Sequence, residues 1–488
     1  MRRDLISFFE GIERPRIAVV GDAIVDEYVW GDVARVSPEA PVMVLQVARR
    51  EYRAGGAGSV VTNLAALKAD VRFFSVRGED GAGERLRSLL EKDGADTTGL
   101  VVEPNRPTTQ KTRHMGYVQH ANRAVQQLLR VDDEVRESIR DTTQSAILER
   151  FRARAADLDA VLVSDYHKGL VSGGLLRSLQ AAAPGVPFLV DPALVDDYSL
   201  YEGCHLICPN RYEAGKASRI DCNDFAGCAA AAEKLARDLR IDAVALTMDR
   251  DGIWLHERAS EGRHFPTRAR TVADVTGAGD MVLSILGLAT AAGGTLAQAV
   301  ELANVAAGIE IRKVGVTPLS RSEILQEMRY EGRPGAGKIK TLEELVPIAQ
   351  QAREAGRTVV FTNGCFDLLH AGHRHLLQGA AREGEVLIVA ANSDASVRRI
   401  KGPGRPRTKE EQRLLDIADL SSVDYVICFD DDKPLALLEA LRPHVLVKGE
   451  EYREGVVVGR ELVEGWGGRV AFVSQIPGIS TSSLLGDR

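Results

Sequence analysis

Two short glycine-containing segments carry the residues best suited to chemistry on phosphate groups. The first is Asp274–Asp280, which reads DVTGAGD and precedes an apolar stretch with helical character. Its two glycines permit a tight turn, so the amides of Gly277, Ala278 and Gly279 would point out of a helix N-terminus, which attracts anions. Asp280 lies in the same turn, where a carboxylate can take the proton from an attacking hydroxyl. The pattern predicts phosphoryl transfer with Asp280 as the base, and an ordinary glycine turn that caps a helix is the alternative.

The second segment, Thr358–His373, reads TVVFTNGCFDLLHAGH and has the pattern of a strand, a glycine turn and a helix start. His370 and His373 are three residues apart, which places both imidazoles on one face of the predicted helix. Gly372 between them permits close approach of a phosphate. Two imidazoles beside a helix N-terminus can stabilise the charge that develops on an α-phosphate and its leaving pyrophosphate. The segment predicts nucleotidyl transfer, with metal ligation or helix capping by the histidines as alternatives.

Both segments lie among short apolar strands that alternate with helical patterns. Examples of such strands are residues 17–20, 161–163, 188–190, 244–246, 359–361, 386–390 and 445–447. Continuous apolar strands separated by helices indicate parallel sheets that are covered on both faces. The length of 488 residues indicates two or three domains. A stretch at 330–340 with three glycines and one proline predicts a linker between a domain of residues 1–329 and a domain of residues 341–488.

Composition argues against several classes of protein. The chain has 62 Lys and Arg against 69 Asp and Glu, a formal net charge of −7, which argues against a dedicated nucleic-acid binder. The longest apolar run, Met281–Gly294, is shorter than the roughly 18–20 residues of a membrane helix. The N-terminal residues lack the pattern of a secretory signal. We therefore expect a cytoplasmic enzyme with small-molecule substrates and neither a nucleic-acid nor a membrane partner.

The first half of the chain resembles the ribokinase (carbohydrate kinase) family, because several further motifs occur in that family's order. They are Gly21-Asp22 with Asp26, Gly55-Gly56, the N-x-x-E pattern of Asn210 and Glu213, Thr247 with Gly252, and the 274–280 segment. The resemblance implies a ribokinase-like α/β/α sandwich with a small β-lid. It implies sugar contacts by Asp22, Asp26, Gly55 and Gly56, ATP-phosphate contacts by Asn210, Glu213 and Thr247, and an indirect Mg²⁺ contact by Asn210 and Glu213.

Within that family the segment resembles the heptose-7-phosphate kinase branch. The match rests on Tyr28, Gly31, residues 35–41, residues 107–111 and residues 164–169. A substrate that already carries phosphate needs a cation at the far end of its pocket, and Arg35, Lys111 and Lys168 are the candidates. Three positions depart from the pattern: Ser59 stands where Asn is usual, Ala193 where Lys is common, and Asp249 replaces a glycine. The first two leave the exact sugar phosphate open.

The second half resembles the cytidylyltransferase-like family of HxGH nucleotidyltransferases over residues 341–488. The resemblance implies a Rossmann-like domain with a parallel sheet and a late Ser/Thr run that holds the β- and γ-phosphates. The implied nucleotide- and phosphate-binding residues are Thr362, Asn363, Gly364, Phe366, Asp367, Lys401, Arg413, Lys448, Ser480, Thr481 and Ser482. Preference for ATP over CTP is carried over from the family and not fixed by these residues.

Together the halves resemble the bifunctional heptose-7-phosphate kinases and heptose-1-phosphate adenylyltransferases. The resemblance implies phosphorylation of D-glycero-β-D-manno-heptose 7-phosphate at its anomeric hydroxyl, then adenylyl transfer to heptose 1-phosphate, which gives ADP-heptose for the lipopolysaccharide inner core. ATP would be the co-substrate and Mg²⁺ the cofactor of both steps. A homodimer formed through the β-lid is also implied. The alternatives are the same chemistry on another sugar phosphate, or a kinase-like half that only binds its ligand.

Overall fold

The computed structural model describes residues 2–117, 125–258, 260–267, 277–312, 318–330, 333 and 335–474. The chain divides into two compact units, Met1–Met328 and Arg329–Arg488, and each unit is described by itself. No helix in these described ranges combines the length and apolarity that crossing a membrane requires.

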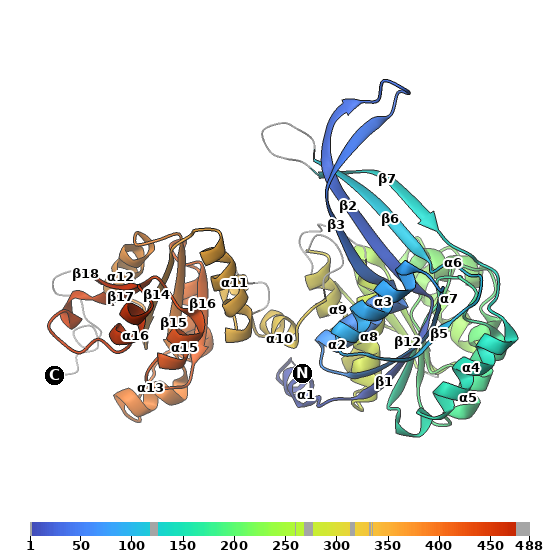
Figure 1. Cartoon of the computed structure of the whole chain (residues 1–488). Coiled ribbons are helices and arrows are strands. Elements are labelled where there is room, and N and C mark those ends of the chain that lie inside the picture. The colour runs from blue at the N-terminus through green and yellow to red at the C-terminus, as the bar shows by residue number, and fades with distance from the viewer. Residues whose placement is uncertain are drawn as a thin grey trace. The chain divides into compact units, whose positions relative to one another are not determined.

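The first unit is built on a nine-stranded sheet (Figure 1). Its strands are β1 (Arg16–Gly21), β4 (Asp70–Arg77), β5 (Asp96–Val102), β8 (Ala160–Ser164), β9 (Phe188–Asp191), β10 (Leu206–Ile207), β11 (Ala243–Thr247), β12 (Ile253–Glu257) and β13 (Arg263–Phe265). Their order in the sheet is β13-β12-β11-β10-β9-β8-β1-β4-β5. Neighbouring strands are parallel from β5 to β11, and β12 and β13 complete an antiparallel edge.

Helices cover both faces of this sheet. They are α1 (Arg2–Gly11), α2 (Ala57–Ala66), α3 (Gly81–Lys92), α4 (Asp141–Arg152), α5 (Gly173–Ala182), α6 (Arg211–Ser218), α7 (Phe225–Asp238), α8 (Ala278–Ala291), α9 (Leu296–Glu310) and α10 (Arg321–Tyr330). Ile17 and Val19 of β1 join the core beneath α2, α8 and α9, whereas Ala18 and Val20 join the core beneath α4, α5 and α7. This alternation explains why the strand is apolar at every position from Ile17 to Val20.

A second, four-stranded sheet forms the lid. Its strands are β2 (Ala23–Val36), β3 (Met43–Gly56), β6 (Gln110–Tyr117) and β7 (Val125–Asp133), in the order β3-β2-β6-β7. A single residue, Asp22, separates β1 from β2, while β3 runs directly into α2, residues 103–109 join β5 to β6, and residues 134–140 join β7 to α4. Figure 1 shows the lid extending away from the helical layers of its own unit. The predicted α/β/α sandwich with a small β-lid is confirmed.

The second unit contains one five-stranded sheet whose paired strands are all parallel. The strands are β14 (Val359–Gly364), β15 (Val386–Asn392), β16 (Tyr425–Phe429), β17 (Val445–Gly449) and β18 (Arg469–Val473), in the order β16-β15-β14-β17-β18. The helices are α11 (Leu342–Glu354), α12 (Ala371–Ala381), α13 (Asp394–Lys401), α14 (Glu410–Ala418), α15 (Leu435–Leu441) and α16 (Arg460–Gly465). Two apolar cores, one on each face, confirm the predicted Rossmann-like arrangement.

The predicted linker at 330–340 differs from a free connector. Tyr330 and Ile339 are 4% and 5% exposed and belong to a core of the second unit. Ile339 forms a β-bridge with Val426, and the Lys340 amide donates to the Val426 carbonyl at 2.8 Å. Gly335, with a φ of 82°, precedes a short 3-10 turn at Ala336–Lys338, so the described part of this stretch packs on the second unit and is not an unattached spacer.

Ile339→Ala should destabilise the second unit by about 2–5 kcal/mol, since the change removes buried methyl and methylene groups from its core. Hydrogen exchange in the full chain should then quicken in β14 and remain unchanged in β1. Ile400→Ala is the matched control, because Ile400 lies in the same unit and is 46% exposed. Unchanged β14 exchange in the Ile339 variant would show that this segment does not stabilise the second unit.

Candidate active sites

Asp280 occupies the first turn of α8, next to the amides of Gly277, Ala278 and Gly279 that are predicted to bind an anion. Gly277 caps the helix with a φ of 91°, a left-handed conformation that favours glycine. Among the described residues no side chain caps this N-terminus, so the position of its amides fits an external anion. Asp280 is only 5% exposed, and this burial raises its pKa to about 7. A hydrogen bond from the Tyr166 hydroxyl, at 3.0 Å from Oδ1, acts in the opposite direction, as does nearby Ser59.

The loop after β8 places Tyr166 beside Asp280, and Asp22 holds this loop. The Asp22 carboxylate accepts hydrogen bonds from the amides of Tyr166, Lys168 and Leu170 at 3.0, 3.0 and 3.3 Å. Burial nevertheless raises the pKa of Asp22, which is 3% exposed. These three hydrogen bonds offset the cost of burying the Asp22 carboxylate. Direct sugar binding by Asp22 stays a prediction.

Two predicted glycines pack against the same region. A Cβ on Gly56, whose φ is +57°, would lie 2.5 Å from the Asp22 carbonyl oxygen. A Cβ on Gly55 would lie 2.1 Å from Asp26 Oδ2. The side chain of Asp26 is ion-paired with Arg113 of β6. Close packing therefore explains both glycines, and sugar contacts by Gly55, Gly56 and Asp26 stay predictions.

Two of the three predicted phosphate-binding cations gather near Tyr166. The Lys111 ammonium lies 5.4 Å from the centroid of the Tyr166 ring. Burial lowers the pKa of Lys111, and neighbouring Asp26 partly offsets this effect. Lys168 is 8% exposed and forms an ion pair with Glu134 at 2.6 Å. The side chain of Arg35 lies outside the described part of the chain. Lys111 thus lies close to the reacting end and not at the far end of the pocket where it was predicted, since its charge also lowers the pKa of Asp280.

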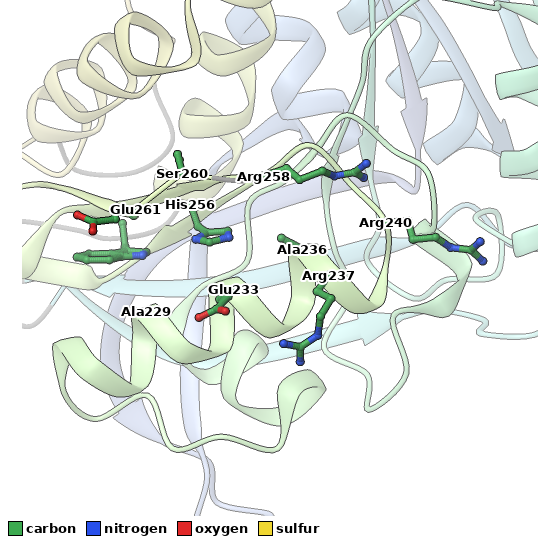
Figure 2. A pocket seen from close by; sticks show the side chains of 11 residues that line it. Ala229, Glu233, Ala236, Arg237, Arg240, His256, Arg258, Ser260 and Glu261 are labelled. Carbon is green, nitrogen blue, oxygen red and sulfur yellow. The ribbon is translucent and has the colours of Figure 1, made fainter.

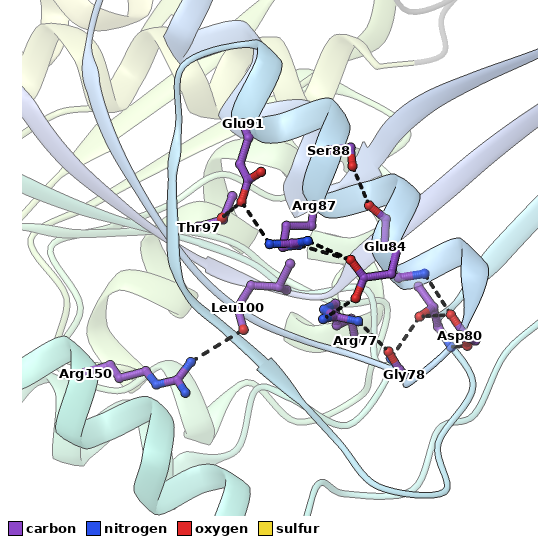
Figure 3. Close-up of polar contacts among 12 residues, drawn as sticks. Arg77, Gly78, Asp80, Glu84, Arg87, Ser88, Glu91, Thr97, Leu100 and Arg150 are labelled. Atoms are coloured by element: carbon purple, nitrogen blue, oxygen red, sulfur yellow. Dashed lines mark hydrogen bonds and ion pairs between the residues drawn. The ribbon is translucent and has the colours of Figure 1, made fainter.

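A network at the start of α3 supports the segment that carries Lys111 (Figure 3). Asp80 caps α3 by accepting from the Gly83 amide at 2.7 Å, and it also accepts from the amide and hydroxyl of Thr108 at 2.7 Å each. The Gly78 amide donates to the Thr108 hydroxyl at 2.8 Å. The next residue, Thr109, accepts from the amide of Val25 in β2. This network fixes the entry to β6, and the sequence motif at 107–111 gave no sign of Asp80.

The predicted ATP-phosphate residues meet at the start of α6. Asn210 forms a β-bridge with Thr247 at the end of β11, so the structure brings these two together. Asn210 and Glu213 form a reciprocal capping box, with bonds of 2.9 Å from the Glu213 amide and 2.8 Å from the Asn210 amide. Burial raises the pKa of Glu213, and the Glu213 charge in turn contributes to the raised pKa of buried Asp191. Phosphate and metal contacts of this pair stay predictions.

Asp249, the departure from the family glycine, is held by an arginine. Its φ of 50° is the left-handed conformation that a glycine would adopt without strain. Arg211 of α6 lies 3.7 Å from the Asp249 carboxylate and also forms an ion pair with Asp251. Arg211 therefore links the turn after Thr247 to the start of α6.

In the second unit the two histidines are stacked at the start of α12, and His370 precedes the helix instead of lying within it. His370 is the N-cap of α12, and its side chain accepts from the His373 amide at 3.4 Å. The two rings lie 3.8 Å apart with an interplanar angle of 22°. The prediction placed His370 within the helix, whereas its extended backbone makes it the N-cap, and the two imidazoles still lie together as expected. Helix capping, one of the alternatives, is what His370 does here.

The surroundings of both imidazoles favour their uncharged form. Burial lowers the pKa of His370 and lowers that of His373 to about 4, and the proximity of the two rings contributes to the latter. The Nδ1 of His373 lies 3.2 Å from the Leu368 carbonyl, which can only accept, so Nδ1 carries the proton in the neutral ring. Lys401 lies near enough to lower both pKa values.

The turn after β14 brings further predicted residues together. The Lys448 ammonium donates to Asn363 Oδ1 at 2.5 Å, and burial lowers the pKa of Lys448 to about 8. Phe366 has a φ of 46° and packs edge-on against His373, with centroids 5.2 Å apart. Thr362 is fully buried, and its hydroxyl finds no hydrogen-bond partner among the described atoms. Gly364 lies beneath Phe366, where a Cβ would come within 3.3 Å of its ring.

Arg413 and Asp367, which were predicted to contact phosphate, form hydrogen bonds with other groups of the protein. Arg413 is 2% exposed and donates to the carbonyls of Cys365, Asn392 and Thr408 and to Asp394, at 2.7–2.9 Å. Asp367 is 1% exposed and accepts from Arg405 at 2.8 Å and from the Arg407 amide at 2.6 Å. Such buried groups hold the turn in place, and any effect on nucleotide acts through that turn. The predicted Ser480, Thr481 and Ser482 lie outside the described residues.

A cavity of about 800 Å³ lies between α7 and β12, away from every predicted site residue (Figure 2). Its guanidinium groups are exposed and already paired: Arg237 with Asp238, Arg240 with Glu202, and Arg258 with Asp242. One lining atom, Trp254 Nε1, is buried without a hydrogen-bond partner among the described residues.

Comparison with known proteins agrees with this geometry. Residues 14–323 match the pfkB family of carbohydrate kinases, and residues 361–481 match the cytidylyltransferase-like family. The first unit has the fold of the Arabidopsis thaliana ribokinase complexed with ribose and ATP, with a TM-score of 0.51 at 19% identity over 65% of this chain and 99% of that one. Escherichia coli phosphofructokinase-2 gives a TM-score of 0.53 at 15% identity, over 66% of this chain and 100% of that chain. The chain is therefore a bifunctional enzyme, a carbohydrate kinase fused to a nucleotidyltransferase.

Full-length relatives identify the family. Bifunctional protein HldE of Citrifermentans bemidjiense is 44% identical over 99% of this chain and 98% of its own length. The HldE proteins of Syntrophotalea carbinolica and Methylobacillus flagellatus are 42% and 41% identical over the same shares of both chains. The chain belongs to the HldE family of bifunctional proteins.

The kinase rate should depend on the ionisation of Asp280. A general base must be deprotonated, so kcat/KM for phosphoryl transfer should be constant above pH about 7 and should fall about tenfold per pH unit below it. The profile is measured on the full chain with adenylyl transfer followed in the same buffers, to exclude general inactivation. A kinase rate that stays level to one pH unit below this value would contradict the assignment of Asp280.

Proposed function

We propose that the first unit phosphorylates D-glycero-β-D-manno-heptose 7-phosphate and that the second makes ADP-heptose from heptose 1-phosphate and ATP. The observation that carries the kinase half is Asp280, a buried carboxylate with a pKa near neutrality in the first turn of a helix that has no side-chain cap. Membership of the HldE family supports the pairing of the two activities in one chain.

In the kinase step the anomeric hydroxyl attacks the γ-phosphorus of ATP. Its O–H proton passes to Asp280 as the new O–P bond forms, and the bond from the γ-phosphorus to the bridging oxygen breaks to release ADP. The amides of Gly277, Ala278 and Gly279 stabilise the charge on the transferring group. Lys111, next to Tyr166, adds a positive charge at the same end of the pocket.

In the second step the phosphate of heptose 1-phosphate attacks the α-phosphorus of ATP and releases pyrophosphate. This nucleophile is already an anion, so the site needs positioning and charge stabilisation and no base. His370 and His373 at the start of α12, with Lys401 and Lys448 beside the turn, are the groups that would supply it. ADP-heptose made in the cytoplasm would serve the inner core of lipopolysaccharide.

Magnesium would enter both sites with ATP. Within the described ranges no three His, Cys, Asp or Glu side chains are grouped to hold a metal. This fits Mg²⁺, which is usually held by one or two carboxylates together with substrate phosphates. Asn210 and Glu213 would contact the ion of the kinase site, in part through water, and the metal would neutralise charge on the phosphates.

The sugar is the least constrained part of the proposal. Ala193, where a lysine is common in the heptose kinase branch, is buried at 3% exposure, and its amide donates to the Tyr201 hydroxyl at 2.9 Å. Ser59 is buried beside Asp280, so its difference from Asn bears on the reacting hydroxyl. A panel of heptose and hexose phosphates separates the alternatives, and preference for a hexose phosphate would replace heptose as the substrate.

Two variants should divide the activities when purified full-length protein is given ATP, Mg²⁺ and heptose 7-phosphate. The wild type should form the 1,7-bisphosphate by mass, and ADP-heptose once a 7-phosphatase is added. Asp280→Asn should lower bisphosphate formation by about a hundredfold or more, with adenylyl transfer of heptose 1-phosphate intact. His373→Asn should lower adenylyl transfer by about a hundredfold with the kinase intact.

Each variant serves as the folding control of the other. Loss of both activities in either variant, with normal thermal unfolding, would overturn the assignment of one reaction to each unit. A fully active Asp280→Asn kinase would instead mean that another group is the base.

We also infer that the lid pairs with the lid of a second copy. Leu129 and Val131 alternate on one face of β7 and are 57% and 49% exposed, which is costly for apolar side chains without a partner. Sedimentation of the wild type should give a dimer, and Leu129→Asp with Val131→Asp should give a monomer. Val456→Asp, at a 91% exposed position of the second unit, is the control. A wild-type monomer at micromolar concentration would contradict the pairing.

A further inference from the structure

Tyr166 is the one phenol that contacts the kinase base in the described structure, and the reaction as proposed assigns it no role. Its hydroxyl donates to Asp280 Oδ1 at 3.0 Å across 114 residues of sequence. Burial and the Asp280 charge raise the pKa of Tyr166 well above its usual value, so the hydroxyl keeps its proton and remains a donor. Because Oδ1 of Asp280 accepts from Tyr166, Oδ2 is the oxygen left to accept from another group.

The main chain around Tyr166 is fixed on both sides. Asp22 accepts from the Tyr166 amide at 3.0 Å, and Asp165 accepts from the His167 amide at 2.8 Å. Asp165 also accepts from the buried Tyr201 hydroxyl at 2.7 Å. Buried carboxylates bonded in this way hold a loop more firmly than its own turns would. The Tyr166 hydroxyl therefore approaches Asp280 from a loop that these hydrogen bonds hold in place.

The ring is fixed from the lid side as well. The Lys111 ammonium lies over it, 5.4 Å from the centroid, and Lys111 belongs to β6. A cation over an aromatic face is attracted by the ring quadrupole. Tyr166 thus links a lid residue to a residue of α8.

We propose that Tyr166 is a positioning residue of the kinase, which holds Asp280 Oδ1 so that Oδ2 accepts the proton of the sugar hydroxyl. During transfer the substrate O–H bond breaks, the proton goes to Oδ2, the O–P bond forms and ADP leaves. The Tyr166 hydroxyl keeps its own proton throughout. It also stabilises the ionised carboxylate before the reaction and thereby keeps the base available near neutral pH. The proposal rests on the kinase function assigned to this site.

Tyr166→Phe in the full-length enzyme tests this role, since it removes one oxygen and little volume. We expect kcat for phosphoryl transfer to fall about tenfold, as for the loss of one hydrogen bond to a charged group. The KM values for ATP and sugar phosphate should change little. Loss of a donor raises the pKa of a carboxylate, so the acid limb of the kinase profile should move up by about one pH unit.

Tyr198→Phe is the matched control. Tyr198 is also buried, at 3% exposure, but its hydroxyl has no hydrogen-bond partner among the described residues. This variant should keep the wild-type pH profile, and both variants should keep wild-type adenylyl transfer, which reports folded protein. An unmoved acid limb in Tyr166→Phe, or an equal movement in Tyr198→Phe, would overturn the positioning role.

The outcome also separates this proposal from the function on which it rests. An inactive Asp280→Asn kinase together with a wild-type Tyr166→Phe profile would refute the positioning role alone. A fully active Asp280→Asn kinase would refute the base itself, and the positioning role with it.

Discussion

The hydrogen bonds of one buried residue, Asp22, hold the kinase site together. Its amide donates to the Ser164 carbonyl, its carbonyl accepts from the Ala57 amide, and its carboxylate accepts from three amides of the loop after β8. A carboxylate buried to this degree is unfavourable without such partners. With them it joins the end of β1, the start of α2 and the loop that carries Tyr166. The Tyr166 hydroxyl therefore reaches Asp280 from a loop that Asp22 holds in place.

The two sites use helix N-termini in different ways. In α8 the cap is Gly277, which has no side chain to offer, so the first amides suit a phosphoryl group. In α12 the cap is His370, whose imidazole accepts from the His373 amide. A nucleotide at α12 therefore meets two uncharged imidazoles and nearby lysines instead of open amides alone. This difference suits the reactions: the kinase must ionise a hydroxyl, whereas the nucleotidyltransferase receives a nucleophile that is already ionised.

Local patterns in the sequence predicted parallel sheets covered on both faces and the position of Asp280, whereas the β-lid was implied only by the family resemblance. Continuous apolar strands and a glycine before an apolar helix depend on neighbours within a few residues, so they can be read along the chain. What was missed depends on contacts across long separations. Nothing near Tyr166 in sequence indicates that its hydroxyl meets Asp280, and nothing near residue 339 indicates that Ile339 pairs with Val426. Motif residues such as Arg413 were expected to contact ligand, but residue type alone does not reveal that a guanidinium is already bonded within the protein.

The single-residue junction between β1 and β2 has a mechanical consequence. Because Asp22 is both that junction and the anchor of the Tyr166 loop, a shift of β2 at this connection would be transmitted to the residues that support Asp280. Lys111 of β6 contacts the ring of Tyr166, so a second strand of the lid meets the same loop. The lid and the catalytic carboxylate are therefore linked through one loop.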